Sequence, residues 1–173
     1  MGRMKRMNRN LFIVLLIVFN IAIDQITKVL VRANISLEPR EEIQLIGDKF
    51  ILTNVYNKGA FLGMGSDLGD TTRWIFLLIL PVLVLGYVTY YIFKSKELDK
   101  LSLIAFCCII GGGIANVYDR FVYGKVTDFF HIDLGGIFKT GIFNVADMSV
   151  TFGLIALILA SFIYKKKNTV KEA

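Results

Sequence analysis

Four long apolar stretches restrict what this chain can fold into. They are Leu11–Arg32, Thr72–Phe93, Leu101–Tyr118 and Ile142–Tyr164. Roughly 20 apolar residues in a helix cross a hydrocarbon layer about 30 Å thick. Hydrophobic residues make up 55% of the 173 residues and the mean hydropathy is +0.60, which exceeds the needs of one soluble core. The sequence therefore predicts an all-α integral membrane protein with four transmembrane helices, forming a single membrane domain over residues 1–173.

The basic residues flank these stretches unevenly. Lysines and arginines gather in the N-terminal tail, in the segment Lys94–Lys100 and in the C-terminal tail, whereas residues 33–71 carry more acidic than basic side chains. Cytoplasmic loops of membrane proteins are enriched in Lys and Arg, so we expect both termini in the cytoplasm and residues 33–71 outside. The net charge of +6 also raises the possibility of nucleic-acid binding, but basic residues that merely flank spans argue against it. The first stretch resembles a secretory signal peptide, yet Asp24–Lys28 and further spans follow it, so we expect it to be retained.

The outer segment has the pattern of a small β-hairpin. Glu41–Ile46 and Phe50–Tyr56 alternate apolar and polar residues, and Gly47-Asp48-Lys49 between them is typical of a tight turn. The following segment, Asn57–Gly65, contains several small residues that permit close backbone approach, although it can equally be a simple turn. Asp70 or Thr71 is expected to cap the second span.

Asp147 stands in the first turns of the fourth span. A carboxylate at the centre of a spanning helix costs roughly 2.5–3.5 kcal/mol, and such residues face protein or water rather than lipid. Asn144 lies three residues earlier and is expected to point the same way, donating an amide hydrogen bond near the carboxylate. The predicted topology places further carboxylates at this face of the membrane. Two that lie close together would share a proton, an arrangement suited to hydrolysing a peptide bond without metal or cofactor.

Spacing leaves three candidates for the second carboxylate: Asp119, Asp128 and Asp133. Arg120 adjoins Asp119 and should hold it ionised in a structural ion pair, which does not suit a shared proton. Asp128 lies in Val126-Thr127-Asp128-Phe129-Phe130, where apolar neighbours can desolvate it. Asp128 is therefore preferred, and Asp133 is the poorest choice.

Other polar residues are expected to support the site. Asn116, Asp119 and Arg120 share one face of a continuing helix, and Asp24 can pair with Lys28 four residues later. The adjacent Cys107 and Cys108 cannot readily form a disulfide with each other and are expected to be small core or lipid-facing residues. His131 is the only histidine, which excludes a multi-histidine metal site.

Several motifs together resemble the bacterial lipoprotein signal peptidases (signal peptidase II). In chain order they are Asp24-Gln25-x-Thr27-Lys28, Asn57-x-Gly59-Ala60, Gly111-Gly112 with Asn116-x-x-Asp119-Arg120, Val126-x-Asp128-Phe129 and Phe143-Asn144-x-Ala146-Asp147. Each motif is weak alone, but their order from the first span to the last is specific. Two positions depart from the usual pattern, Phe61 in place of a second alanine and Ala115 in place of a glycine, and both concern the shape of the substrate cleft.

The resemblance implies a membrane aspartyl endopeptidase of the bacterial cytoplasmic membrane whose site lies near the outer face. Its substrates would be prolipoproteins with a diacylglyceryl-modified cysteine, cut just before that cysteine, and it would need no cofactor or metal and would act as a monomer. Asp128 and Asp147 would be catalytic. The residues that would support the site or position substrate are Asp24, Lys28, Asn57, Gly59, Asn116, Asp119, Arg120 and Asn144.

Two other functions fit parts of the sequence. A proton-coupled small membrane carrier would use Asp24, Asp119 and Asp147 as a relay, but it predicts carboxylates spread through the depth of the membrane. A membrane transferase that binds Mg²⁺ would use the same carboxylate cluster, and a chelator would inactivate it.

Overall fold

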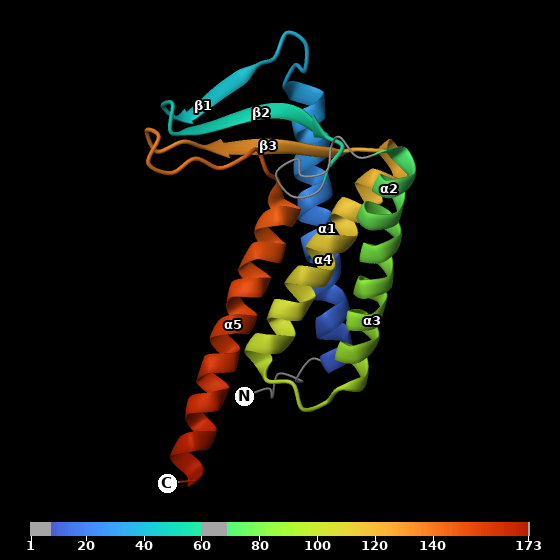
Figure 1. Cartoon of the computed structure of the whole chain (residues 1–173), viewed down its shortest axis with the longest axis vertical. Coiled ribbons are helices and arrows are strands. Elements are labelled where there is room, and N and C mark those ends of the chain that lie inside the picture. The colour runs from blue at the N-terminus through green and yellow to red at the C-terminus, as the bar shows by residue number, and fades with distance from the viewer. Residues whose placement is uncertain (1–7, 60–68, 173) are drawn as a thin grey trace, which may run out of the picture.

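The computed structural model describes residues 8–59 and 69–172, and these form a helical bundle with a small sheet at one end. Four helical spans are long and apolar enough to cross a membrane, at Arg9–Asn34, Thr71–Lys94, Lys100–Tyr123 and Val145–Ile163. The predicted all-α membrane architecture with a small β element is therefore confirmed. Figure 1 shows the sheet lying across one end of the bundle, with the start of α1 and the end of α5 toward the opposite end.

The helices are longer than the apolar stretches suggested. They are α1 (Arg9–Asn34), α4 (Lys100–Tyr123), α5 (Val145–Glu172) and a second span made of α2 (Asp70–Trp74), a π-helical turn at Ile75–Ile79 and α3 (Leu80–Lys94). The second span begins after Gly69 as its N-cap, so the expectation that Asp70 or Thr71 caps it is wrong. Asp99 does cap α4, because its carboxylate accepts a hydrogen bond from the backbone N–H of Ser102 at 3.0 Å.

The sheet has three antiparallel strands in the order β1 (Glu42–Ile46), β2 (Phe50–Asn57), β3 (Val126–Ile132). The β1–β2 hairpin was predicted, but β3 was not. Gly124 ends α4 with a φ of 67°, a left-handed conformation that glycine adopts without steric cost, and so turns the chain directly into β3. In the register of β2 and β3, Val55 lies opposite Asp128.

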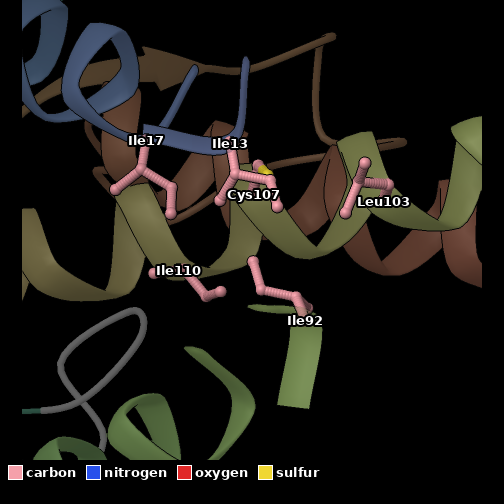
Figure 2. Packing of buried hydrophobic residues seen from close by; sticks show 6 residues of the cluster. All are labelled: Ile13, Ile17, Ile92, Leu103, Cys107 and Ile110. Atoms are coloured by element: carbon pink, nitrogen blue, oxygen red, sulfur yellow. The ribbon is translucent and has the colours of Figure 1, made fainter. Parts of the chain in front are cut away.

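The larger of two apolar clusters among the described residues lies toward the end of the bundle away from the sheet, and the smaller one, where the end of α1 meets β3, contains Val31, Ile35 and Phe129. Ile13 and Ile17 of α1 and Ile92 of α3 pack against α4, as Figure 2 shows; the α4 members of the cluster are Leu103, Cys107 and Ile110. Cys107 is fully buried there, as expected for a small core residue. At this same end, the guanidinium of Arg9 donates to the carbonyl of Ser95 at 2.7 Å, which joins the start of α1 to the α3–α4 connection.

Candidate functional site

The start of α5 is fixed by a reciprocal pair of hydrogen bonds between Asn144 and Asp147. The side-chain oxygen of Asn144 accepts from the backbone N–H of Asp147 at 2.9 Å, and the Asp147 carboxylate accepts from the backbone N–H of Asn144 at 3.1 Å. This is a capping box, in which a residue before the helix and one in its first turn satisfy each other's backbone N–H groups. Asp24 of α1 accepts from another backbone N–H of the first turn, that of Ala146, at 2.8 Å. Asp147 therefore occupies its position partly because the helix end needs an acceptor there.

The second oxygen of Asp147 faces α4. It accepts a hydrogen bond at 2.9 Å from the side-chain amide of Asn116. Asp147 is only partly buried, whereas Asn144 beside it is fully buried. Neutral donors thus hold the carboxylate from two sides, and part of the residue stays exposed at the surface of the protein.

Asp128 comes to the same place from β3. One of its oxygens accepts from the Asn144 amide at 2.6 Å, and the other accepts from the Asn57 amide of β2 at 2.9 Å. The side chain is 2% exposed, next to the buried Val126 and Phe129. Burial and the nearby Asp147 carboxylate raise the pKa of Asp128 to about 6, against the opposing effect of the two amide hydrogen bonds.

Asn144 joins the two carboxylates. Its side chain binds Asp128 through the amide nitrogen and the backbone of Asp147 through the amide oxygen, and the same nitrogen also donates to Asn116 at 3.2 Å. The predicted role of Asn144 was to donate an amide hydrogen bond near the Asp147 carboxylate. The structure shows instead that its backbone N–H does so, while its amide donates to the partner carboxylate.

A buried ion cluster lies behind this pair. The ammonium group of Lys28 is 2.7 Å from Asp24 and 2.9 Å from Asp119, and all of these side chains are fully buried. It also donates at 2.8 Å to the side-chain oxygen of Asn116, which turns the amide nitrogen of Asn116 toward Asp147. Lys28 therefore determines which way the Asn116 amide points.

Asp119 pairs with Lys28 and not with Arg120, so the expected ion pair of adjacent residues on α4 is wrong. Neighbouring residues on a helix point in different directions, which is why the side chains of Asp119 and Arg120 separate. Arg120 instead donates to the backbone carbonyl of Gly59 at 2.8 Å and to that of Asn116 at 3.2 Å. Since Asn57 also accepts from the N–H of Gly59 at 2.8 Å, the end of β2 is fixed to α4.

Comparisons with known proteins show the family of the chain. The family model described as signal peptidase (SPase) II matches residues 16–163, which is most of the chain and includes every site residue above. The chain belongs to the signal peptidase II family.

The sequence matches to individual relatives extend over most of this chain and most of each relative. A lipoprotein signal peptidase of Pseudoalteromonas atlantica is 39% identical over 150 residues, 87% of either chain, and one of Brevibacillus brevis is 39% identical over 148 residues, 86% of this chain and 93% of the relative. A solved bacterial membrane enzyme, determined by the in meso method at 2.3 Å resolution, is similar with a TM-score of 0.77 and 26% identity over 90% of each chain. The predicted family is confirmed, and the chain is a multi-pass bacterial membrane protein.

Two helices of this signal peptidase approach very closely beside the site. A Cβ atom added to Gly112 of α4 would lie 2.4 Å from the carbonyl oxygen of Ala146, and one added to Gly153 of α5 would lie 2.8 Å from that of Ala105. Small residues let membrane helices pack at short distances. The contact at Gly112 fixes the turn of α5 that carries Asp147.

Some predicted residues lie elsewhere, and one was missed. Asp133 is outside the site: it pairs with the exposed Lys139 at 3.1 Å, and hydrogen bonds from the backbone of Gly136 and from Lys139 lower its pKa. Phe61 lies outside the described residues, whereas Ala115 is fully buried and its carbonyl accepts from Gln25 at 3.3 Å. Gln25 also donates to Asp119 at 3.0 Å, a role that its position as an uncharged amide inside an apolar span could have indicated.

Proposed function

We propose that this chain is an aspartyl endopeptidase that removes signal peptides from prolipoproteins, with Asp128 and Asp147 as its catalytic pair. The observation that carries the proposal is that Asn144 binds both residues, so that two carboxyl groups from separate segments meet in a largely buried place. The family and the names of the relatives support the same reaction.

The geometry supports a division of labour within the pair. Two close, desolvated carboxyl groups share one proton, and the raised pKa of Asp128 favours it as the member that carries the proton. The ionised Asp147 then takes a proton from a water molecule as that water attacks the scissile carbonyl carbon. Asp128 donates its proton to the carbonyl oxygen, and the resulting tetrahedral intermediate collapses as the amine leaves with a proton from the pair.

The remaining polar residues hold these groups in position. Asn57, Asn116 and Asn144 are uncharged donors, so they orient the carboxylates without locking both in the ionised state. Asp24, Lys28 and Asp119 hold Asn116 and the start of α5, while Arg120 holds the Gly59 end of β2.

A cavity of about 170 Å³ adjoins the site at Arg120. It is formed between the second span and the end of α4, and its lining residues are Lys58, Arg73, Trp74, Leu77, Leu78, Arg120 and Gly124. The lining combines apolar side chains of the second span with the basic side chains of Lys58, Arg73 and Arg120. We place the diacylglyceryl-modified cysteine of the substrate beside this cavity, with cleavage just before that cysteine.

The orientation follows from charge. The end opposite the sheet carries Lys94, Lys96 and Lys100, so it belongs in the cytoplasm together with both termini, and the site lies near the outer face of the bacterial cytoplasmic membrane. On this account residues 1–173 act as one membrane domain, as a monomer and without cofactor or metal.

The decisive experiment is incubation of purified protein with a diacylglyceryl-modified prolipoprotein, with release of the signal peptide as the readout. The wild type should cleave it in the presence of EDTA, and Asp133→Asn, which alters a partly exposed carboxylate outside the site, should cleave it at a similar rate. Asp128→Asn and Asp147→Asn should not. Loss of wild-type activity with EDTA would indicate metal chemistry, and normal cleavage by either dyad variant would exclude the aspartyl mechanism.

A further inference from the structure

Exposed apolar side chains gather at the free end of the sheet. The β1–β2 turn and the loop after β3, here called the sheet tip, present Leu45, Ile46, Leu134, Ile137 and Phe138. Ile137 is 95% exposed and Ile46 is 66% exposed. Surface apolar residues occur singly in most proteins, whereas a contiguous patch marks a surface that contacts something.

Backbone contacts make the two loops one surface. The N–H of Asp133 donates to the carbonyl of Lys49 at 3.0 Å, and Phe50 lies opposite Ile132 in the register of β2 and β3. Within the second loop, the N–H of Leu134 donates to the carbonyl of Phe138 at 2.8 Å, which closes the turn that carries Ile137 at its apex. The exposed side chains therefore sit on a braced structure rather than on separate loops.

The sheet tip extends sideways beyond the bundle at the membrane boundary. Figure 1 shows the strands running across the ends of the helices and past α5, so that the tip projects to the side of this helix. The lipid side of α5 carries exposed apolar residues that include Phe152, Leu154 and Ile155. The tip thus continues the lipid-facing surface of α5 outward at the level where that helix begins.

We propose that the sheet tip inserts its apolar side chains into the headgroup region of the leaflet on the sheet's side of the membrane. The partner is the phospholipid surface, since the tip adjoins the lipid-facing side of a spanning helix. Lys49 and Lys139 at the tip can bury their aliphatic stems in the same region while their ammonium groups stay in water. Because β3 carries both this loop and Asp128, the contact fixes the height of the sheet, and of this carboxylate, relative to the membrane. The insertion itself does not depend on the proposed reaction.

The test uses a single tryptophan in the full-length protein. Trp74 is the only tryptophan, so Ile137→Trp is made in a Trp74→Phe background and reconstituted as one copy per phosphatidylcholine–phosphatidylglycerol nanodisc. The matched control is Glu42→Trp, at the far end of the exposed strand β1. Leu134→Trp provides a second probe within the tip, and thermal unfolding establishes that each variant is folded.

With lipids brominated near the headgroup, Ile137→Trp and Leu134→Trp should lose most of their emission, while Glu42→Trp should keep it and respond to aqueous iodide instead. Tryptophan emission at position 137 that brominated lipid does not quench and iodide does would overturn the proposal. Shielding at position 137 that appears only when two copies share a nanodisc would overturn it too, because it would assign the surface to a second copy of the chain.

Discussion

Replacing Lys28 by methionine should destabilise the protein more than any other loss of a single charge among the described ion pairs. The substitution keeps the length of the side chain but removes its ammonium group. Asp24 and Asp119, both fully buried, then lose their cation, and Asn116 loses the donor that orients its amide. The fold is left with uncompensated carboxylates in a low-dielectric interior.

The expected size follows from burial. Removing one partner of a buried ion pair costs about 3–5 kcal/mol, whereas an exposed pair is worth about 0–1 kcal/mol. For a chain of this size, each kcal/mol lowers the melting temperature by roughly 2–4 °C, so Lys28→Met should lower it by roughly 6–20 °C. The matched control is Lys139→Met, which removes the cation of a pair 3.1 Å long whose lysine is 63% exposed, and it should change the melting temperature little.

Thermal unfolding in detergent measures both variants, and a third one isolates the cause. In Lys28→Met with Asp24→Asn and Asp119→Asn, no buried charge of the cluster is left unpaired, so much of the lost stability should return. Equal melting temperatures for Lys28→Met and Lys139→Met would refute the argument. So would a triple variant that is less stable than Lys28→Met, because it would show that the carboxylates do not depend on the lysine for compensation.

Three further predictions concern the site. Asp128→Asn and Asp147→Asn should each abolish nearly all signal-peptide release, and the double variant should be hardly worse than either, since groups that act as a unit are non-additive; additive losses in a cleavage assay would contradict a shared role. The pKa of Asp128 is about 6 in the folded protein, and its ordinary value is 3.8. Between these pH values the folded state binds more protons than the unfolded state. The free energy of unfolding should therefore fall as pH rises from about 4 to about 6, by at most about 3 kcal/mol. Asp128→Asn should remove that fall. If the free energy of unfolding changed with pH in the same way for the wild type and this variant, Asp128 would titrate normally. Gly112→Ala places a methyl group against the Ala146 carbonyl, so it should lower the free energy of unfolding by about 1–3 kcal/mol and remove much of the activity. Gly86→Ala is the control, because its methyl group would meet open space, and it should change neither stability nor activity. Equal melting temperatures of the two variants would show that α4 and α5 can separate freely.

The sequence was informative where one residue type conflicts with its surroundings. Asp147 could be identified because a carboxylate inside an apolar stretch is costly, and the four spans could be identified because their length has to match the membrane. Asp128 could be preferred because its neighbours are apolar, and the structure does bury it. Each of these conclusions used only the chemistry of a short local segment.

Contacts between distant segments were harder to predict. The strand that carries Asp128 was missed because its partner, β2, lies far away in the chain and the short apolar run Val126–Ile132 has no distinctive pattern. The partner of Asp119 was misassigned because Arg120 is adjacent in sequence, whereas Lys28 faces it from another helix. The π-helical turn at Ile75–Ile79 lies in a uniformly apolar stretch in which nothing marks it.

The capping box at the start of α5 has a consequence for the order of synthesis. Asn144 supplies the hydrogen bonds that join the two carboxylates, and it precedes the last span of the chain. Until α5 packs against the rest of the bundle, Asp128 has neither the Asn144 amide nor Asp147 beside it. On the proposed assignment, the catalytic pair is therefore complete only once the final helix has joined the bundle.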